Sequence, residues 1–144
     1  MNIVHASAGD LAEIRALLDA ERLPSADVDA GKVGGMRIAR NENGVMIGVI
    51  GLESHAPAGL LRSLVVAPSQ RGGGLGAALV AAIEGEAREG GIRDLFLLTT
   101  TAEEFFARLH YIRVPRESAP AVLQSTAEFA ALCPATAVCM RKTP

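Results

Sequence analysis

The chain has 144 residues and a formal net charge of −2, which is the size of one domain and leaves no excess of basic residues. Hydrophobic residues make up 49% and charged residues 21% of the chain, and these proportions are those of a globular protein and exclude a disordered one. Aromatic residues are only 3%, so few side chains are available to stack on bases, and no basic excess exists to neutralise phosphates. We therefore expect no nucleic-acid partner.

The sequence also lacks the patterns of membrane and secreted proteins. No apolar stretch approaches about 20 residues, and Met1–Asp10 has no basic start followed by an apolar run, so we expect neither a membrane segment nor a signal peptide. Two cysteines are too few for a disulfide framework, which favours the reducing cytoplasm. Cys133 and Cys139 have no nearby histidine and not the spacing of a zinc pair, so we expect no metal cofactor. Binding of a thiophilic metalloid by the two thiolates stays open as an alternative.

The first half of the chain predicts a strand and a helix followed by three strands. Leu11–Ala20 carries apolar residues at helical spacing, and Asp10 with Glu13 three residues later fits a capping box. Leu23–Asp27 is typical of a turn, and Asn43-Gly44 predicts a hairpin turn between two strands. The expected strands are Met1–Ala6, Met36–Arg40, Val45–Leu52 and Leu60–Val66.

The second half alternates between helix and strand. A helix begins near Leu75 and ends at Gly90, another follows around Phe105–Leu109, and Pro120–Leu132 is helical in parts. The expected strands are Asp94–Thr100, Tyr111–Val114 and Ala135–Met140. Together these elements predict an α/β fold with a mixed central sheet of six to seven strands flanked by helices, in a single domain that covers residues 1–144.

A glycine-rich loop, Arg71–Ala77, lies between a strand and a helix and is the most informative segment. Glycines allow the backbone to approach a ligand closely, and the following helix adds unsatisfied N–H groups, so the loop predicts a pyrophosphate site. A dinucleotide-binding protein would have a carboxylate for the ribose after the next strand, where this chain has Leu98-Thr99-Thr100. A Walker A loop would have Lys-Ser or Lys-Thr after its last glycine, and this chain has Ala77-Ala78. The NAD-dependent oxidoreductase alternative therefore rests on the glycine pattern alone.

The order of elements and this loop resemble the GNAT acetyltransferase superfamily. Leu64-Val65-Val66-Ala67-Pro68 followed by Arg71-x-x-Gly74-x-Gly76 is similar to the acetyl-CoA loop of that superfamily and the strand before it. The resemblance implies a GNAT fold, acetyl-CoA as cosubstrate, a small-molecule amine as acceptor and a homodimer. The residues implied to bind the cofactor are Leu64, Val65, Val66, Arg71, Gly72, Gly73, Gly74, Leu75, Gly76 and Ala77.

Three further segments resemble the arsenic-resistance-associated N-acetyltransferases. These are Leu61–Leu64, Leu97–Glu103 and the segment Glu128-Phe129-x-x-Leu132-Cys133-Pro134. This resemblance implies an acceptor that is amino-acid-like or arsenic-related. Many GNAT relatives have a tyrosine that protonates the leaving thiolate where this chain has Phe106. A non-catalytic acyl-CoA-binding or metalloid-sensing module is therefore the alternative function.

Glu53, at the end of its strand, is the candidate general base, since its apolar neighbours would raise the pKa of its carboxyl. An exposed turn carboxylate is the alternative interpretation of Glu53, and His55 is the alternative base. The candidate substrate-binding residues are Arg62, Ser63, Thr99 and Thr100. Strand alternation predicts that Arg62 shares a face with Leu60, Leu64 and Val66 and that Ser63 points the other way. A charge on that face requires either an acidic partner such as Glu53 or a substrate anion.

Overall fold

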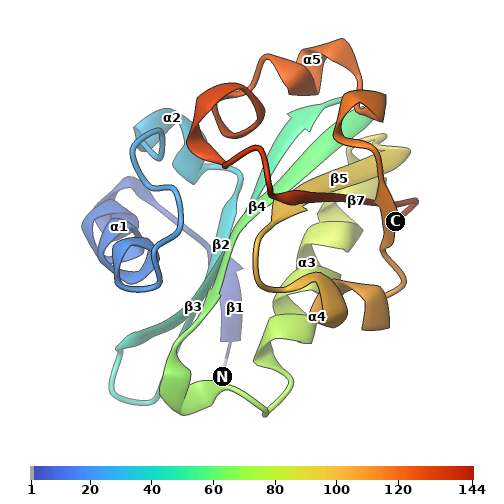
Figure 1. Cartoon of the computed structure of the whole chain (residues 1–144). Helices are drawn as coiled ribbons and strands as arrows, with labels where there is room; N and C mark the ends of the chain where they lie inside the picture. Colours follow the sequence, from blue (N-terminus) through green and yellow to red (C-terminus); the bar gives the residue numbers. More distant parts are fainter. Residues whose placement is uncertain (1) are drawn as a thin grey trace.

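One mixed sheet of seven strands forms the centre of the protein (Figure 1). A computed structural model describes residues 2–144, and its strands lie in the order β1-β2-β3-β4-β5-β7-β6. The strands are β1 Asn2–His5, β2 Met36–Arg40, β3 Met46–His55, β4 Ala58–Val66, β5 Asp94–Thr99, β6 Ile112–Val114 and β7 Val138–Lys142. Within residues 2–144, β4 and β5 are the only parallel neighbours. The predicted α/β fold with a mixed sheet flanked by helices is confirmed.

Helices cover both faces of the sheet (Figure 1). They are α1 Leu11–Ala20, α2 Ala30–Val33, α3 Leu75–Glu89, α4 Glu103–Arg108 and α5 Ala121–Gln124. α1 packs on one face through Ile14 and Leu18, in a buried cluster that continues into β2 and β3. α3 packs on the other face through Leu79 and Ile83, together with Phe106 of α4. Even α3, the longest described helix at 15 residues, is too short to cross a membrane, and no other helix in residues 2–144 qualifies.

The C-terminal part of the chain adds short turns over one end of the sheet. α5 is followed by a π-helical turn, Glu128–Leu132. Leu123 and Phe129 from these two turns pack in a third buried cluster with Leu60 of β4 and Phe96 of β5. Single 3-10 turns occur at Ala8–Asp10, Pro68–Gln70 and Arg116–Ser118.

The capping box predicted for the first helix was wrong by one turn. Ser7 and Asp10 form the box, and the backbone N–H of Ser7 donates to Asp10 Oδ2 at 2.8 Å. The 3-10 turn that they enclose leads directly into α1. Glu13 is not available as a capping residue because its carboxylate accepts a hydrogen bond from Arg40 of β2 at 2.9 Å.

β4 carries a bulge near its middle. Between the register pairs Val49–Val65 and Gly51–Arg62, β4 has one residue more than β3. Ser63 lies at this bulge with a φ of 62°, in the left-handed region that L residues seldom adopt.

The bulge reverses the alternation of side chains along β4. Leu64 and Val66 pack against the cluster on the α3 side of the sheet, whereas Leu60 belongs to the cluster under α5. The prediction that Arg62 shares its face with Leu64 and Val66 was therefore wrong, because a strand-period pattern does not reveal an inserted residue.

β4 and β5 pair over only a short stretch. Ala58–Leu60 is paired with Asp94–Phe96, and the described register extends no further along either strand. From Leu61 onward the two strands diverge, so the β5-facing edge of β4 has no strand partner there. This opening positions the candidate site.

Candidate functional site

A cavity of about 1330 Å³ lies where β4 and β5 diverge. Its walls come from Leu61–Val66 of β4, the glycine-rich loop with the start of α3, and the segment from the end of β5 into α4. Asp19 in the last turn of α1, the following residues Glu21–Pro24, and Glu128 with Leu132–Pro134 close the remaining sides. Of the predicted cofactor-binding residues, all except Gly73 line this cavity. The predicted substrate residues Arg62, Ser63, Thr99 and Thr100 line it as well, and Glu53 does not.

The glycine-rich loop has the backbone that an anion site needs. Gly72 and Gly74 have φ values of 85° and 86°, and a Cβ added at either would meet no atom within 4 Å. The space in front of the loop is therefore open, and α3 begins at the next residue, Leu75, with its unsatisfied N–H groups at the same place. At Gly76 close packing disfavours a side chain, because an added Cβ would lie 3.2 Å from the ring of Phe105. These residues fit a bound pyrophosphate.

Arg71 links the loop to its surroundings. Its Nε donates to the carbonyl oxygen of Val66 at 3.1 Å, and its guanidinium forms an ion pair with Glu21. The Arg71 side chain is about half exposed and lines the cavity, so it remains accessible to an anion there.

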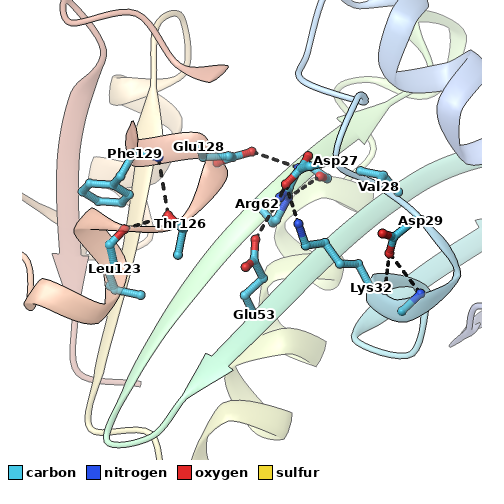
Figure 2. Close-up of polar contacts among 12 residues, drawn as sticks. Asp27, Val28, Asp29, Lys32, Glu53, Arg62, Leu123, Thr126, Glu128 and Phe129 are labelled. Atoms are coloured by element: carbon cyan, nitrogen blue, oxygen red, sulfur yellow. Dashed lines mark hydrogen bonds and ion pairs between the residues drawn. The ribbon is translucent and has the colours of Figure 1, made fainter. Parts of the chain in front are cut away.

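Arg62 lies at the centre of a cluster of charged side chains (Figure 2). Its Nη1 donates to Glu53 Oε2 at 2.8 Å and its Nη2 to Asp27 Oδ1 at 2.6 Å, while Nη1 also bonds the second Asp27 oxygen. Nη2 lies 3.4 Å from Glu128 Oε2. The side chain is only 3% exposed, and the acidic-partner alternative for Arg62 is thus the one that the structure contains.

Ser63 does not point away from Arg62. Its Oγ accepts a hydrogen bond from Arg62 Nε at 3.1 Å, because the bulge turns its side chain toward the guanidinium. With this bond, every N–H group of Arg62 has an oxygen within reach. The predicted contact of Arg62 with a substrate anion stays a prediction, and it would require displacing one of these oxygens.

Two carboxylates of the cluster were not among the predicted site residues. Burial works against the charge of Asp27, but hydrogen bonds from Arg62 and Lys32 hold the pKa of that carboxyl at about 2. Burial raises the pKa of Glu128 to about 7, even though Arg62 lies beside it. The sequence signal for Glu128 is an acid within the apolar run Ala127–Leu132, which is easily read as an exposed helical position.

No tyrosine replaces the missing hydroxyl of Phe106 in the described cavity wall. Phe106 is buried, lines the cavity, and packs edge-on against Phe105 and Tyr111 with ring centroids 5.1 and 5.4 Å away. The hydroxyl of Tyr111 donates to Glu84 in the core at 2.8 Å and does not reach the cavity.

The two cysteines lie in different surroundings. Cys133 lines the cavity, whereas Cys139 belongs to the buried cluster around Leu60 and Phe96. Burial raises the pKa of the two thiols to about 12 and about 11, so both carry their proton near neutral pH.

Comparison with known proteins assigns the chain to a family. The sequence model of the Acetyltransferase (GNAT) family matches residues 12–111, well over half of the chain. The chain belongs to the GNAT acetyltransferase family. The match spans the glycine-rich loop and both strands that frame the cavity of this GNAT protein. None of the curated proteins compared with it matches.

Solved structures share the GNAT fold over nearly the whole chain. N-acetylglutamate synthase from Neisseria gonorrhoeae, complexed with coenzyme A and N-acetyl-glutamate, has a TM-score of 0.84 and 24% identity over 99% of this chain. The chain spans only 34% of that synthase. Rv2747 from Mycobacterium tuberculosis, in complex with CoA and NLQ, has a TM-score of 0.83 and 22% identity, covering 100% of this chain and 99% of its own. A GNAT-family acetyltransferase from Staphylococcus aureus has a TM-score of 0.73 and 14% identity, covering 99% and 98% of the two chains.

Proposed function

We propose that this protein is an acetyl-CoA-dependent N-acetyltransferase that acts on a small amine. The observation that carries the proposal is the continuity of one cavity from the glycine-rich loop to the unpaired edge of β4. Such a cavity has an anion-binding end and a strand edge that can pair with an extended ligand chain. Family membership and the CoA complexes of two structural neighbours support the same cosubstrate.

Each wall of the cavity has a role in this reaction. The N–H groups of the glycine-rich loop hold the pyrophosphate, with Arg71 adding a positive charge. The free edge of β4 from Leu64 to Val66 binds the extended pantetheine arm and supplies an N–H group for the carbonyl oxygen of the thioester. The acceptor amine enters from the side of the π-helical turn and the segment after α1.

The transfer forms one bond and breaks one. The lone pair of the amine nitrogen attacks the thioester carbon, a C–N bond forms, and the negative charge on oxygen is stabilised by the N–H group of β4. The C–S bond then breaks, and the proton left on nitrogen passes to the departing thiolate. A thiol with a pKa of about 8.5 can leave near neutral pH without a prior proton donor, which fits a site with Phe106 in place of tyrosine.

We propose an amino-acid-like or arsenic-related compound as the acceptor, in a cytoplasmic homodimer. The amino-acid part is supported by the neighbour that binds N-acetyl-glutamate, and the arsenic part by the resemblance of Leu61–Leu64 and Glu128–Pro134 to arsenic-resistance enzymes. Thr100 and Ser63 line the cavity and offer hydroxyls to such an acceptor. Glu53 stays a predicted base, although it reaches the site only through Arg62.

A thiol-release screen tests the proposal. Purified protein is incubated with acetyl-CoA and with amino acids, their arsenic and phosphorus analogues, polyamines or aminoglycosides, and free thiol is followed with a chromogenic reagent. Release that depends on both protein and amine is the expected result. CoA binding measured by calorimetry without thiol release for any amine would favour the acyl-CoA-binding module instead, and no CoA binding would exclude both.

A further inference from the structure

Three carboxylates surround Arg62, and one of them differs from the other two. Asp27 and Glu53 accept short hydrogen bonds from the guanidinium, and neither lines the cavity. Glu128 lines the cavity, although its side chain is only 5% exposed. Glu128 is therefore the one of these three carboxylates that a ligand in the cavity can touch.

The carboxylate of Glu128 has unused hydrogen-bonding capacity. Within residues 2–144, neither of its oxygens accepts a hydrogen bond, and the contact of Oε2 with Arg62 Nη2 is long at 3.4 Å. Glu128 is one of the residues that line the cavity, so a ligand there can approach its side chain. A buried carboxylate whose one charged contact is this long is incompletely stabilised, and a ligand that donates hydrogen bonds would lower the cost of its burial.

The turn that carries Glu128 is held firmly in place. Its π-helical geometry is rare and is often found at functional sites. Thr126 Oγ1 accepts from the N–H of Phe129 at 3.4 Å, and the carbonyl oxygen of Glu128 accepts from the N–H of Cys133 at 3.0 Å. Arg116 donates to the carbonyl oxygens of Phe129 and Pro134 at 2.8 and 2.7 Å. A fixed backbone of this kind can aim a side chain at a reacting atom.

The charges of the cluster favour a cation over an anion. When ionised, Asp27, Glu53 and Glu128 contribute three negative charges against the two positive charges of Arg62 and Lys32. The N–H groups of Arg62 are already directed at these carboxylates and at Ser63. The net charge of −1 therefore attracts an ammonium group, and no free guanidinium fork remains for a carboxylate.

We propose that Glu128 binds the ammonium group of the acceptor and removes its proton before acetyl transfer. This inference rests on the proposed function and adds to it the class of acceptor, a primary amine that arrives as a cation. One proton passes from the ammonium nitrogen to a Glu128 oxygen and leaves through the cavity to solvent. The neutral nitrogen then attacks the thioester, and its second proton goes to the departing thiolate.

The surroundings of Glu128 suit this role. Its pKa of about 7 is matched to proton transfer near neutral pH. The charged and titratable groups that face it are Arg62 from β4, Asp27 from the segment before α2, Lys32 from α2, Glu53 from β3 and Cys133 at the end of its own turn. Among these groups Arg62 and Lys32 oppose the upward shift, and burial exceeds their effect.

Binding of an ammonium ion can be measured without any acetyl transfer. Protein carrying glutamate labelled with ¹³C at the side-chain carboxyl is titrated by NMR, and the signal missing from the Glu128→Gln variant identifies Glu128. We expect its midpoint near neutral pH and a fall of about one unit when ethylammonium chloride is added, because a nearby positive charge favours the carboxylate. Sodium acetate at equal ionic strength should not shift it. A normal midpoint, no response to ethylammonium, or a response to acetate instead would overturn the proposal.

Proton removal is tested by the pH dependence of acetyl transfer from acetyl-CoA to ethylamine. The Glu128→Gln variant should lose roughly 10²–10⁴ in rate together with the ascending limb of the pH profile, with unchanged affinity for CoA. Glu42→Gln is the control, since Glu42 is exposed in the turn between β2 and β3 and does not line the cavity. If Glu53→Gln lost the ascending limb of the pH–rate profile while Glu128→Gln kept it, Glu53 would be the base and the proposal would be refuted. A wild-type protein that transfers no acetyl group would count against the proposed function, while the NMR titration still decides the ammonium site.

Discussion

Gly74 and Gly44 have similar positive φ angles but different surroundings. Their φ values are 86° and 78°, and an added Cβ would meet no atom within 4 Å at either position. Gly74 lines the cavity at the start of α3, whereas Gly44 is in the turn between β2 and β3 and does not. An alanine at either position adopts the left-handed region at a cost of roughly 1–2 kcal/mol. The pair therefore separates backbone strain from loss of ligand space.

Replacing Gly74 by alanine should weaken CoA binding about tenfold or more, because the methyl group occupies space that the pyrophosphate requires in front of the loop. Gly44→Ala should have the affinity of the wild type. Urea unfolding should show similar losses of stability in the two variants, and calorimetric titration with CoA should separate them. Equal CoA affinities in both variants would show that the loop does not bind the cofactor.

At the scale of elements, the π-helical turn Glu128–Leu132 depends on one arginine outside it. Arg116 donates hydrogen bonds to Phe129 and Pro134, and its guanidinium lies 5.6 Å from the centre of the Phe129 ring. Hydrogen bonds that involve a charged group contribute about 1.5–3 kcal/mol each. The turn itself has too few residues to be stable as an isolated helix. The position of Glu128 is therefore set by Arg116 more than by local helix propensity.

Arg116→Gln should raise the KM for the acceptor amine and lower the free energy of unfolding, while the affinity for CoA stays unchanged. The reason is that the variant loosens the acceptor wall of the cavity and leaves the glycine-rich loop intact. Arg113→Gln is the control, because Arg113 is 69% exposed and its ion pair with Glu103 is long at 3.8 Å. If Arg116→Gln reduced CoA affinity as strongly as amine affinity, the two halves of the cavity would not be independent.

At the scale of the whole molecule, local patterns and long-range contacts differ in how far the sequence predicts them. The strands, helices and glycine-rich loop could be predicted because hydrophobic period, turn residues and glycines act within a few residues. The bulge at Ser63 could not, since it depends on the register with β3. Glu128 was missed for the same reason: Arg62 and Asp27 reach it only after the C-terminal segment has folded back over β4.

The cluster around Arg62 also makes the stability of the molecule depend on pH, in two opposite directions. The pKa of Asp27 is lowered from 3.8 to about 2. Its stabilising contribution to the free energy of unfolding is therefore present above pH 3.8 and is lost as the pH falls through 2. The pKa of Glu128 is raised from 4.5 to about 7. Its stabilising contribution to the free energy of unfolding is therefore present below pH 4.5 and is lost as the pH rises through 7. Above neutral pH the protein therefore holds a buried charge that opposes folding.

Glu128→Gln should remove that opposition. The amide has the same size and carries no charge, so the free energy of unfolding should change little between about pH 5 and about pH 8, whereas that of the wild type should fall. At about pH 8 the variant should be the more stable protein, by up to about 3 kcal/mol, because a rise of the pKa from 4.5 to about 7 corresponds to that difference. Urea unfolding across this range measures both proteins, and the exposed-site variant Glu42→Gln should follow the wild type. Parallel curves for wild type and Glu128→Gln would mean that Glu128 titrates as an ordinary glutamate. A variant that is more stable but inactive would show that the protein retains a destabilising carboxylate because acetyl transfer requires it.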